Sequence, residues 1–96
     1  MIRLRWYIGL TSASGTPVTG AEQAECAQAV GVVYSGCTVY RTLGLWCGHW
    51  EDSLVLEVLT EEPVKAPAIL AGELQHIARQ SSVLWTRESV EGGFTA

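Results

Sequence analysis

Residues 53–59, SLVLEVL, decide the fold, because this short stretch is apolar on both of the faces that a β-strand presents. Successive side chains of a strand point to opposite sides of a sheet, so a run that is apolar at both parities belongs to a strand buried on both faces. Such a strand has a neighbour on each edge. The pattern therefore predicts a central strand, around which the rest of the chain is arranged.

Three further strands are predicted on either side of this stretch. In residues 1–10, MIRLRWYIGL, apolar and polar residues alternate, which is typical of a strand with one buried face. Residues 37–46, CTVYRTLGLW, also alternate and predict a second strand. Residues 46–52, WCGHWED, contain one glycine and are expected to form the connection to the central strand. Residues 82–90 are expected to form the last strand.

Two helices separate these strands. Thr19 and Glu22 have the spacing of a capping box, so a helix is predicted over residues 19–34. Residues 64–80 begin with prolines and carry apolar residues at intervals of three and four, which predicts a second helix.

The predicted order is strand, helix, strand, strand, helix, strand. We therefore expect an α+β chain with a single ferredoxin-like domain over residues 1–96, in which a four-stranded antiparallel sheet carries two helices on one face. Right-handed crossovers then place the strands in the order fourth, first, third, second.

Composition limits the functions that the chain can serve. Its 96 residues carry ten acidic and six basic side chains, for a formal net charge of −4. A binder of DNA or RNA needs a basic surface, so nucleic acid is not an expected partner. Charged residues make up only 17% of the chain, against roughly 25% in ordinary soluble domains. Because a small domain exposes much surface, this low charge predicts a homo-oligomer, a dimer or larger.

The sequence carries no signal for export or membrane insertion. The start, MIRLRWYIGL, lacks the apolar core and cleavage site of a signal peptide, and no run reaches the roughly 18 apolar residues of a membrane span. A cytoplasmic protein without a membrane partner is therefore expected. Cys26, Cys37 and Cys47 match neither a disulfide framework nor a zinc site, so we expect free thiols, no metal and no cofactor.

Several short phrases, spread over most of the chain, are shared with known proteins. They are YIGL at 7–10 with Gly15 and VT at 18–19, TV at 38–39 with GLW at 44–46, SLVL at 53–56, and QSSVL at 80–84. With these phrases the chain resembles a small family of bacterial and phage proteins that have a ferredoxin-like fold and no assigned activity. The resemblance implies that fold and assigns no role to any residue.

One face of the predicted sheet is not covered by helices and is the first candidate site. It displays side chains from three strands: Arg3, Arg5, Tyr7, Thr38, Tyr40, Thr42, Val55, Glu57 and Leu59. Arginine binds phosphate or carboxylate through its planar fork, and aromatic rings stack on flat ligands. We expect this face either to hold a nucleotide-like ligand or to be covered by another subunit.

The second candidate site is the segment 46–52, in which two tryptophans, a cysteine, a histidine and two carboxylates lie together. Trp46 and Trp50 are interpreted as an aromatic clamp for a ligand ring, or as the tip of a hairpin that packs on a neighbouring subunit. A Cys47–His49 catalytic pair or a metal site is disfavoured, because adjacent loop residues rarely hold a nucleophile and its base in place. The loop 11–19 matches no phosphate-binding motif and is expected to be a plain connection.

These observations lead to one main functional hypothesis. We expect a non-enzymatic oligomer that binds or sequesters a small, anionic, aromatic, nucleotide-like ligand. The residues expected to bind it are Arg3, Arg5, Tyr7, Tyr40, Trp46 and Trp50, and no catalytic residue is assigned. Two alternatives stay open: an assembly or protein-interaction module, and a small enzyme of the dimeric ferredoxin-like barrel type. The enzyme is disfavoured because Glu57 and the two histidines are isolated in the sequence.

Overall fold

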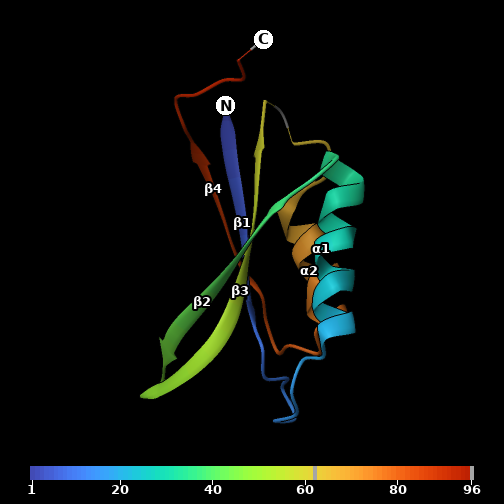
Figure 1. The fold of residues 1–96 in the computed structure, drawn as a ribbon, viewed down its shortest axis with the longest axis vertical. Helices are drawn as coiled ribbons and strands as arrows, with labels where there is room; N and C mark the ends of the chain where they lie inside the picture. Colours follow the sequence, from blue (N-terminus) through green and yellow to red (C-terminus); the bar gives the residue numbers. More distant parts are fainter. Residues whose placement is uncertain (62, 96) are drawn as a thin grey trace.

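The computed structural model describes residues 1–61 and 63–95. Its elements follow the predicted order: β1 (Ile2–Gly9), α1 (Gly20–Tyr34), β2 (Thr38–Trp46), β3 (His49–Thr60), α2 (Pro67–Ile77) and β4 (Leu84–Ser89). The strands form one antiparallel sheet in the order β2-β3-β1-β4, and both helices lie on the same side of it (Figure 1). The predicted ferredoxin-like arrangement and its strand order are confirmed.

The alternation along β1 separates the core from the open face of the sheet. Leu4, Trp6 and Ile8 are buried on the helix side. The core is completed by Leu54, Leu56, Val58, Cys26, Val30, Leu70 and Leu74. The indole Nε1 of Trp6 donates a hydrogen bond to the carbonyl oxygen of Pro67 at 3.0 Å, which satisfies its buried N–H and ties β1 to the start of α2.

The β2–β3 hairpin differs most from the prediction. β3 begins at His49, four residues earlier than expected, so the connection between the strands shrinks to Cys47 and Gly48. Both have a positive φ, 49° and 79°, as in the type I′ turns whose twist matches that of a hairpin. The end of the hairpin extends beyond the helices (Figure 1). There the strands have no core to face, so their apolar side chains are exposed, and the polar residues among 49–52 are typical of a loop.

Helix α1 starts as the sequence predicts. Thr19 Oγ1 accepts a hydrogen bond from the Glu22 amide at 3.1 Å, and Glu22 Oε1 accepts one from the Thr19 amide at 2.9 Å. These bonds satisfy two amides that the first turn would otherwise leave unpaired. The helix ends before Ser35, which is in the left-handed region with a φ of 63°.

Helix α2 is shorter than predicted at both ends. It begins at Pro67, because the residue before a proline is disfavoured in a helix, and it stops before Arg79, whose φ is 52°. Its buried side is formed by Pro67, Leu70, Ala71 and Leu74, whereas Ile69 is 59% exposed. Among the described residues, no helix combines the length and the apolar character needed to cross a membrane.

Candidate functional site

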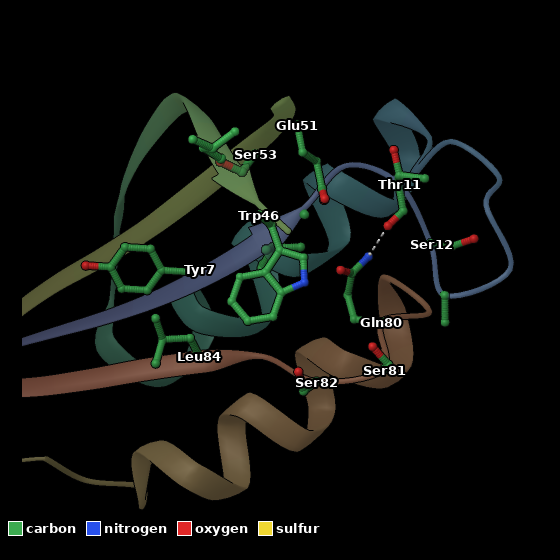
Figure 2. A pocket seen from close by; sticks show the side chains of 15 residues that line it. Tyr7, Thr11, Ser12, Trp46, Glu51, Ser53, Gln80, Ser81, Ser82 and Leu84 are labelled. Carbon is green, nitrogen blue, oxygen red and sulfur yellow. Dashed lines mark hydrogen bonds between the residues drawn. The ribbon is translucent and has the colours of Figure 1, made fainter. Parts of the chain in front are cut away.

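A cavity of about 540 Å³ lies where the end of β1, the start of β4 and the β2–β3 hairpin meet. The loop after β1 and the loop between α2 and β4 close its remaining sides (Figure 2). The lining residues are Tyr7, Ile8, Gly9, Thr11, Ser12, Ala13, Gly44, Leu45, Trp46, Glu51, Ser53, Gln80, Ser81, Ser82 and Leu84. The volume falls in the range typical of small-molecule sites.

Glu51 brings a free carboxylate to this cavity. β3 places it opposite Gly44, and its side chain leans towards the end of β1 (Figure 2). The Glu51 carboxylate makes no hydrogen bond and no ion pair with the residues that the structure describes. A partly buried carboxylate without a partner favours a cation or a hydrogen-bond donor as its neighbour.

Gln80 adds a second oxygen beside this carboxylate. Its amide nitrogen donates to the carbonyl oxygens of Thr11 at 3.1 Å and Ala78 at 3.0 Å, so both amide hydrogens are used. The amide oxygen is thereby left as an acceptor, and it lies with the Glu51 carboxylate above Gly9. Of the lining residues, none is a lysine or an arginine. The cavity is therefore electronegative, and the prediction of an anionic ligand does not fit it.

Two aromatic residues line the cavity beside these polar groups. Tyr7 and Trp46 both line it, and the Trp46 ring lies between Tyr7 and Gln80 in the view of Figure 2. Trp46 is 74% exposed, so most of its ring surface is free to stack on a ligand. Ser12, Ser53 and Ser82 line the same space, but the Ser12 hydroxyl bonds to Thr16 and the Ser53 hydroxyl to Thr42.

Arg3, Arg5 and Tyr40 of the predicted site lie outside the cavity, around Glu57. On the open face of the sheet, Glu57 accepts hydrogen bonds from Arg5 Nε at 2.7 Å and from Tyr40 at 3.0 Å, and Arg3 Nε lies 3.2 Å from it. Burial opposes the ionisation of Glu57, which is only 7% exposed, but these bonds and charges hold its pKa below the ordinary value. The two arginines are thus occupied by a carboxylate of the same chain.

The structure brings together only part of the predicted ligand site. Tyr7 and Trp46 share the cavity, whereas Trp50 does not line it. Trp50 pairs with Leu45 across the hairpin and Trp46 pairs with His49, so the two tryptophans lie on opposite faces of it. Within one chain they do not form the expected clamp.

Neither a metal centre nor a disulfide is evident in the part of the chain that the structure describes. No three His, Cys, Asp or Glu side chains gather there where they could hold an ion. Cys26 is buried, Cys37 is half-buried and Cys47 is exposed at the hairpin turn, and all three are free. Burial, followed by the charges of Glu25 and Glu22, raises the pKa of Cys26 to about 11, so this thiol is not a nucleophile at neutral pH.

Known proteins with this fold include an enzyme. No protein-family model matches the chain, and no curated protein matches its sequence. Similar solved structures include a phage SAM lyase in complex with S-methyl-5′-thioadenosine, with a TM-score of 0.69, and a phage SAM lyase in the apo state, with a TM-score of 0.67. Each is 16% identical to this chain and covers 91% of it, and the matches span 79% and 78% of the lyase chains. At this identity the likeness shows the fold.

This comparison corrects the functional hypothesis. The prediction of a non-enzymatic binding protein is contradicted, because the similar solved structures are those of a lyase, one of them holding a small nucleoside ligand. The sequence argument failed because it looked for an acid–base pair close together in the chain.

Glu51 lies in the second candidate segment, 46–52, but neither it nor Gln80 was among the residues predicted to bind the ligand. Glu51 was placed in a loop, although a two-residue turn at Cys47 and Gly48 would have put it on the same face as Tyr40. Gln80 comes from the far end of the sequence, and no local signal connects it with Glu51.

Proposed function

We propose that this chain is a lyase that binds S-adenosylmethionine in the cavity and releases S-methyl-5′-thioadenosine. One observation carries the proposal: the Glu51 carboxylate and the Gln80 amide oxygen converge in a cavity that Tyr7 and Trp46 line and no basic side chain enters. S-adenosylmethionine combines a flat adenine ring with a sulfonium and an ammonium group. The similarity of the fold to a phage SAM lyase supports the same assignment.

Each part of this substrate has a matching surface in the cavity. The adenine ring would stack on Trp46 or Tyr7, and the ribose hydroxyls would bond with the Ser82 hydroxyl. The positive charge of the methionine part would lie beside Glu51, where partial burial strengthens the attraction relative to bulk water. Cation–π contact with the tryptophan ring adds to it.

The proposed reaction breaks the bond between the sulfonium sulfur and the methionine side-chain carbon. The electron pair of that bond stays on sulfur, which becomes the neutral thioether of methylthioadenosine. As that bond breaks, either the carboxylate oxygen of the methionine part bonds to the same carbon and closes a lactone, or the neighbouring carbon gives a proton to the solvent and a double bond forms. Neither route consumes water or an oxidant. Glu51 and Gln80 bind the cationic substrate and orient it, and the neutral product, which has lost both positive groups, leaves more readily.

The test is the release of methylthioadenosine from S-adenosylmethionine, measured by liquid chromatography. We expect the wild-type chain to release it, and Glu51→Gln to lower kcat/KM at least tenfold, which corresponds to about 1.4 kcal/mol. Asp52→Asn is the matched control, because Asp52 is the next residue of β3, is exposed and does not line the cavity. Intact substrate after prolonged incubation, together with no binding of the stable cationic analogue sinefungin, would contradict the proposal.

We further propose that copies of the chain associate through the β2–β3 hairpin. The support is a group of exposed apolar side chains near its tip: Leu43, Leu45, Trp46 and Trp50. β2 is also an edge strand, whose free backbone groups favour pairing with another chain. The cytoplasmic location expected from the sequence stays a prediction.

A further inference from the structure

Gly9 occupies a position at which glycine is not needed for the backbone. The glycines with positive φ in the described chain are Gly15, Gly36 and Gly48, so the backbone at Gly9 is one that other residues adopt readily. Gly9 is the last residue of β1, where it pairs with Ser53 of β3. One reason for a glycine in a strand is the close approach of another group.

Such an approach is present in the cavity. A Cβ atom at Gly9 would lie 1.9 Å from Glu51 Oε1 and 3.1 Å from both the Glu51 carboxyl carbon and Gln80 Oε1. The first distance is far inside van der Waals contact, so any side chain at this position must displace the Glu51 carboxylate. Gly44, also in the cavity, differs: there a Cβ would lie 3.8 Å from the nearest atom, the Glu51 carbonyl oxygen, in ordinary contact.

We propose that Gly9 is a positioning residue that sets where the Glu51 carboxylate lies, and thereby makes the cavity select cationic over neutral thioadenosine compounds. This inference rests on the proposed function and deepens it. The absent side chain provides the space in which the carboxylate lies beside Gln80 Oε1. A methyl group there would turn the flexible Glu51 side chain away from the ligand, and would leave Trp46 and Tyr7 in place.

The inference predicts a change in selectivity rather than a general loss of binding. The probes are sinefungin, which carries an amine in place of the sulfonium group, and neutral S-methyl-5′-thioadenosine, both measured by isothermal titration calorimetry. We expect wild type to bind sinefungin at least tenfold more tightly than methylthioadenosine. In Gly9→Ala this ratio should fall at least fivefold, while the affinity for methylthioadenosine changes less than threefold. Gly72→Ala is the control, because Gly72 is exposed on α2 with no atom within 4 Å of an added Cβ.

A double-mutant cycle separates this role from a general structural one. If Gly9 acts through Glu51, the double variant Gly9→Ala with Glu51→Ala should have the same ratio of the two affinities as Glu51→Ala alone. The double variant has lost the clashing carboxylate, so it should fold even where Gly9→Ala alone does not. The inference would be overturned if Gly9→Ala had the same ratio as wild type. It would also be overturned if the ratio of the double variant were lower than that of Glu51→Ala alone. A wild-type ratio near one would instead overturn the cation site of the proposed function, and this inference with it.

Discussion

Arg79 donates two parallel hydrogen bonds to the Glu22 carboxylate, from Nε to Oε2 at 2.8 Å and from Nη2 to Oε1 at 2.8 Å. The pair joins the first turn of α1 to the chain just after α2. Arg79 also donates to Thr16 and to the carbonyl oxygen of Pro17. One guanidinium therefore fastens the loop after β1, whose residues Thr11, Ser12 and Ala13 form one wall of the cavity.

This pair predicts how stability changes in acid. The hydrogen bonds from Arg79, and then that from the Thr19 amide, lower the pKa of Glu22 from 4.5 to about 2. A lowered pKa in the folded state means that the stabilisation is complete above the unfolded pKa and is lost as the pH falls through the folded one. We expect Glu22→Gln to lower Tm at pH 7 and to reduce the loss of Tm between pH 4.5 and 2. Thermal unfolding followed by circular dichroism measures both.

Glu25→Gln is the control for this experiment, since Glu25 is exposed on the same helix. Equal acid sensitivity of the Glu22→Gln variant and wild type would show that Glu22 does not stabilise the fold through its charge.

The cluster around Glu57 predicts a second effect on stability. Glu57→Gln leaves Arg5 without its carboxylate and Arg3 paired with Glu88 alone, and we expect the free energy of unfolding in urea to fall by about 1–2 kcal/mol. The effect stays below the roughly 3–5 kcal/mol of fully buried pairs because both arginines are partly exposed to solvent. Glu88→Gln, on the edge strand β4, should change the free energy by less than about 0.5 kcal/mol. Equal effects of the two substitutions would argue against a specific role for Glu57.

The two tryptophans of the hairpin should differ in ligand binding. Trp46 lines the cavity, whereas Trp50, which is 68% exposed, lies on the other face of the hairpin. Trp46→Ala should weaken the binding of methylthioadenosine by about 1–3 kcal/mol, the range for loss of a stacking aromatic side chain. Trp50→Ala should change this affinity less than about threefold, because Trp50 does not line the cavity. Calorimetry measures the affinity of both variants for methylthioadenosine. A larger loss of affinity in Trp50→Ala than in Trp46→Ala would show that the adenine ring does not stack on Trp46.

Association through the hairpin is tested by two substitutions on one of its faces. Leu45 and Trp50 are cross-strand partners, and both are exposed. We expect light scattering to give more than the monomer mass of 10.4 kDa for wild type and the monomer mass for Leu45→Lys with Trp50→Lys, because lysine on an exposed strand opposes pairing. Val32→Lys, on the exposed side of α1, should leave the assembly intact. A monomeric wild type at micromolar concentration would rule the association out.

The sequence predicts the fold wherever a side chain has a core to face. The alternation of Leu4, Trp6 and Ile8, and the two-sided apolar run in β3, determine the order of the strands, since burial imposes the period of two. The same signal fails in the outer part of the hairpin, because Glu51 and Asp52 lie in a strand that extends past the core. There the strand is held by backbone pairing and by a turn of only two residues, which composition identifies poorly.

The candidate site was less accessible to sequence reasoning. Parity correctly placed Arg5, Tyr40 and Glu57 on one face, but it did not show that Glu57 occupies the arginines. The convergence of Glu51 and Gln80 depends on how far each side chain reaches across Gly9. Such distances arise from tertiary structure, and no spacing along the chain encodes them.

The alternation of β1 also has an evolutionary consequence. Leu4 and Trp6 serve only the core, whereas Tyr7 and Gly9, which alternate with the core residues, line the cavity. Neighbouring codons of one strand are therefore exposed to different selection. Substitutions at the outward positions can adapt the strand to a new ligand while the inward residues keep the domain folded. Alternate residues of one strand therefore serve the ligand site and the fold.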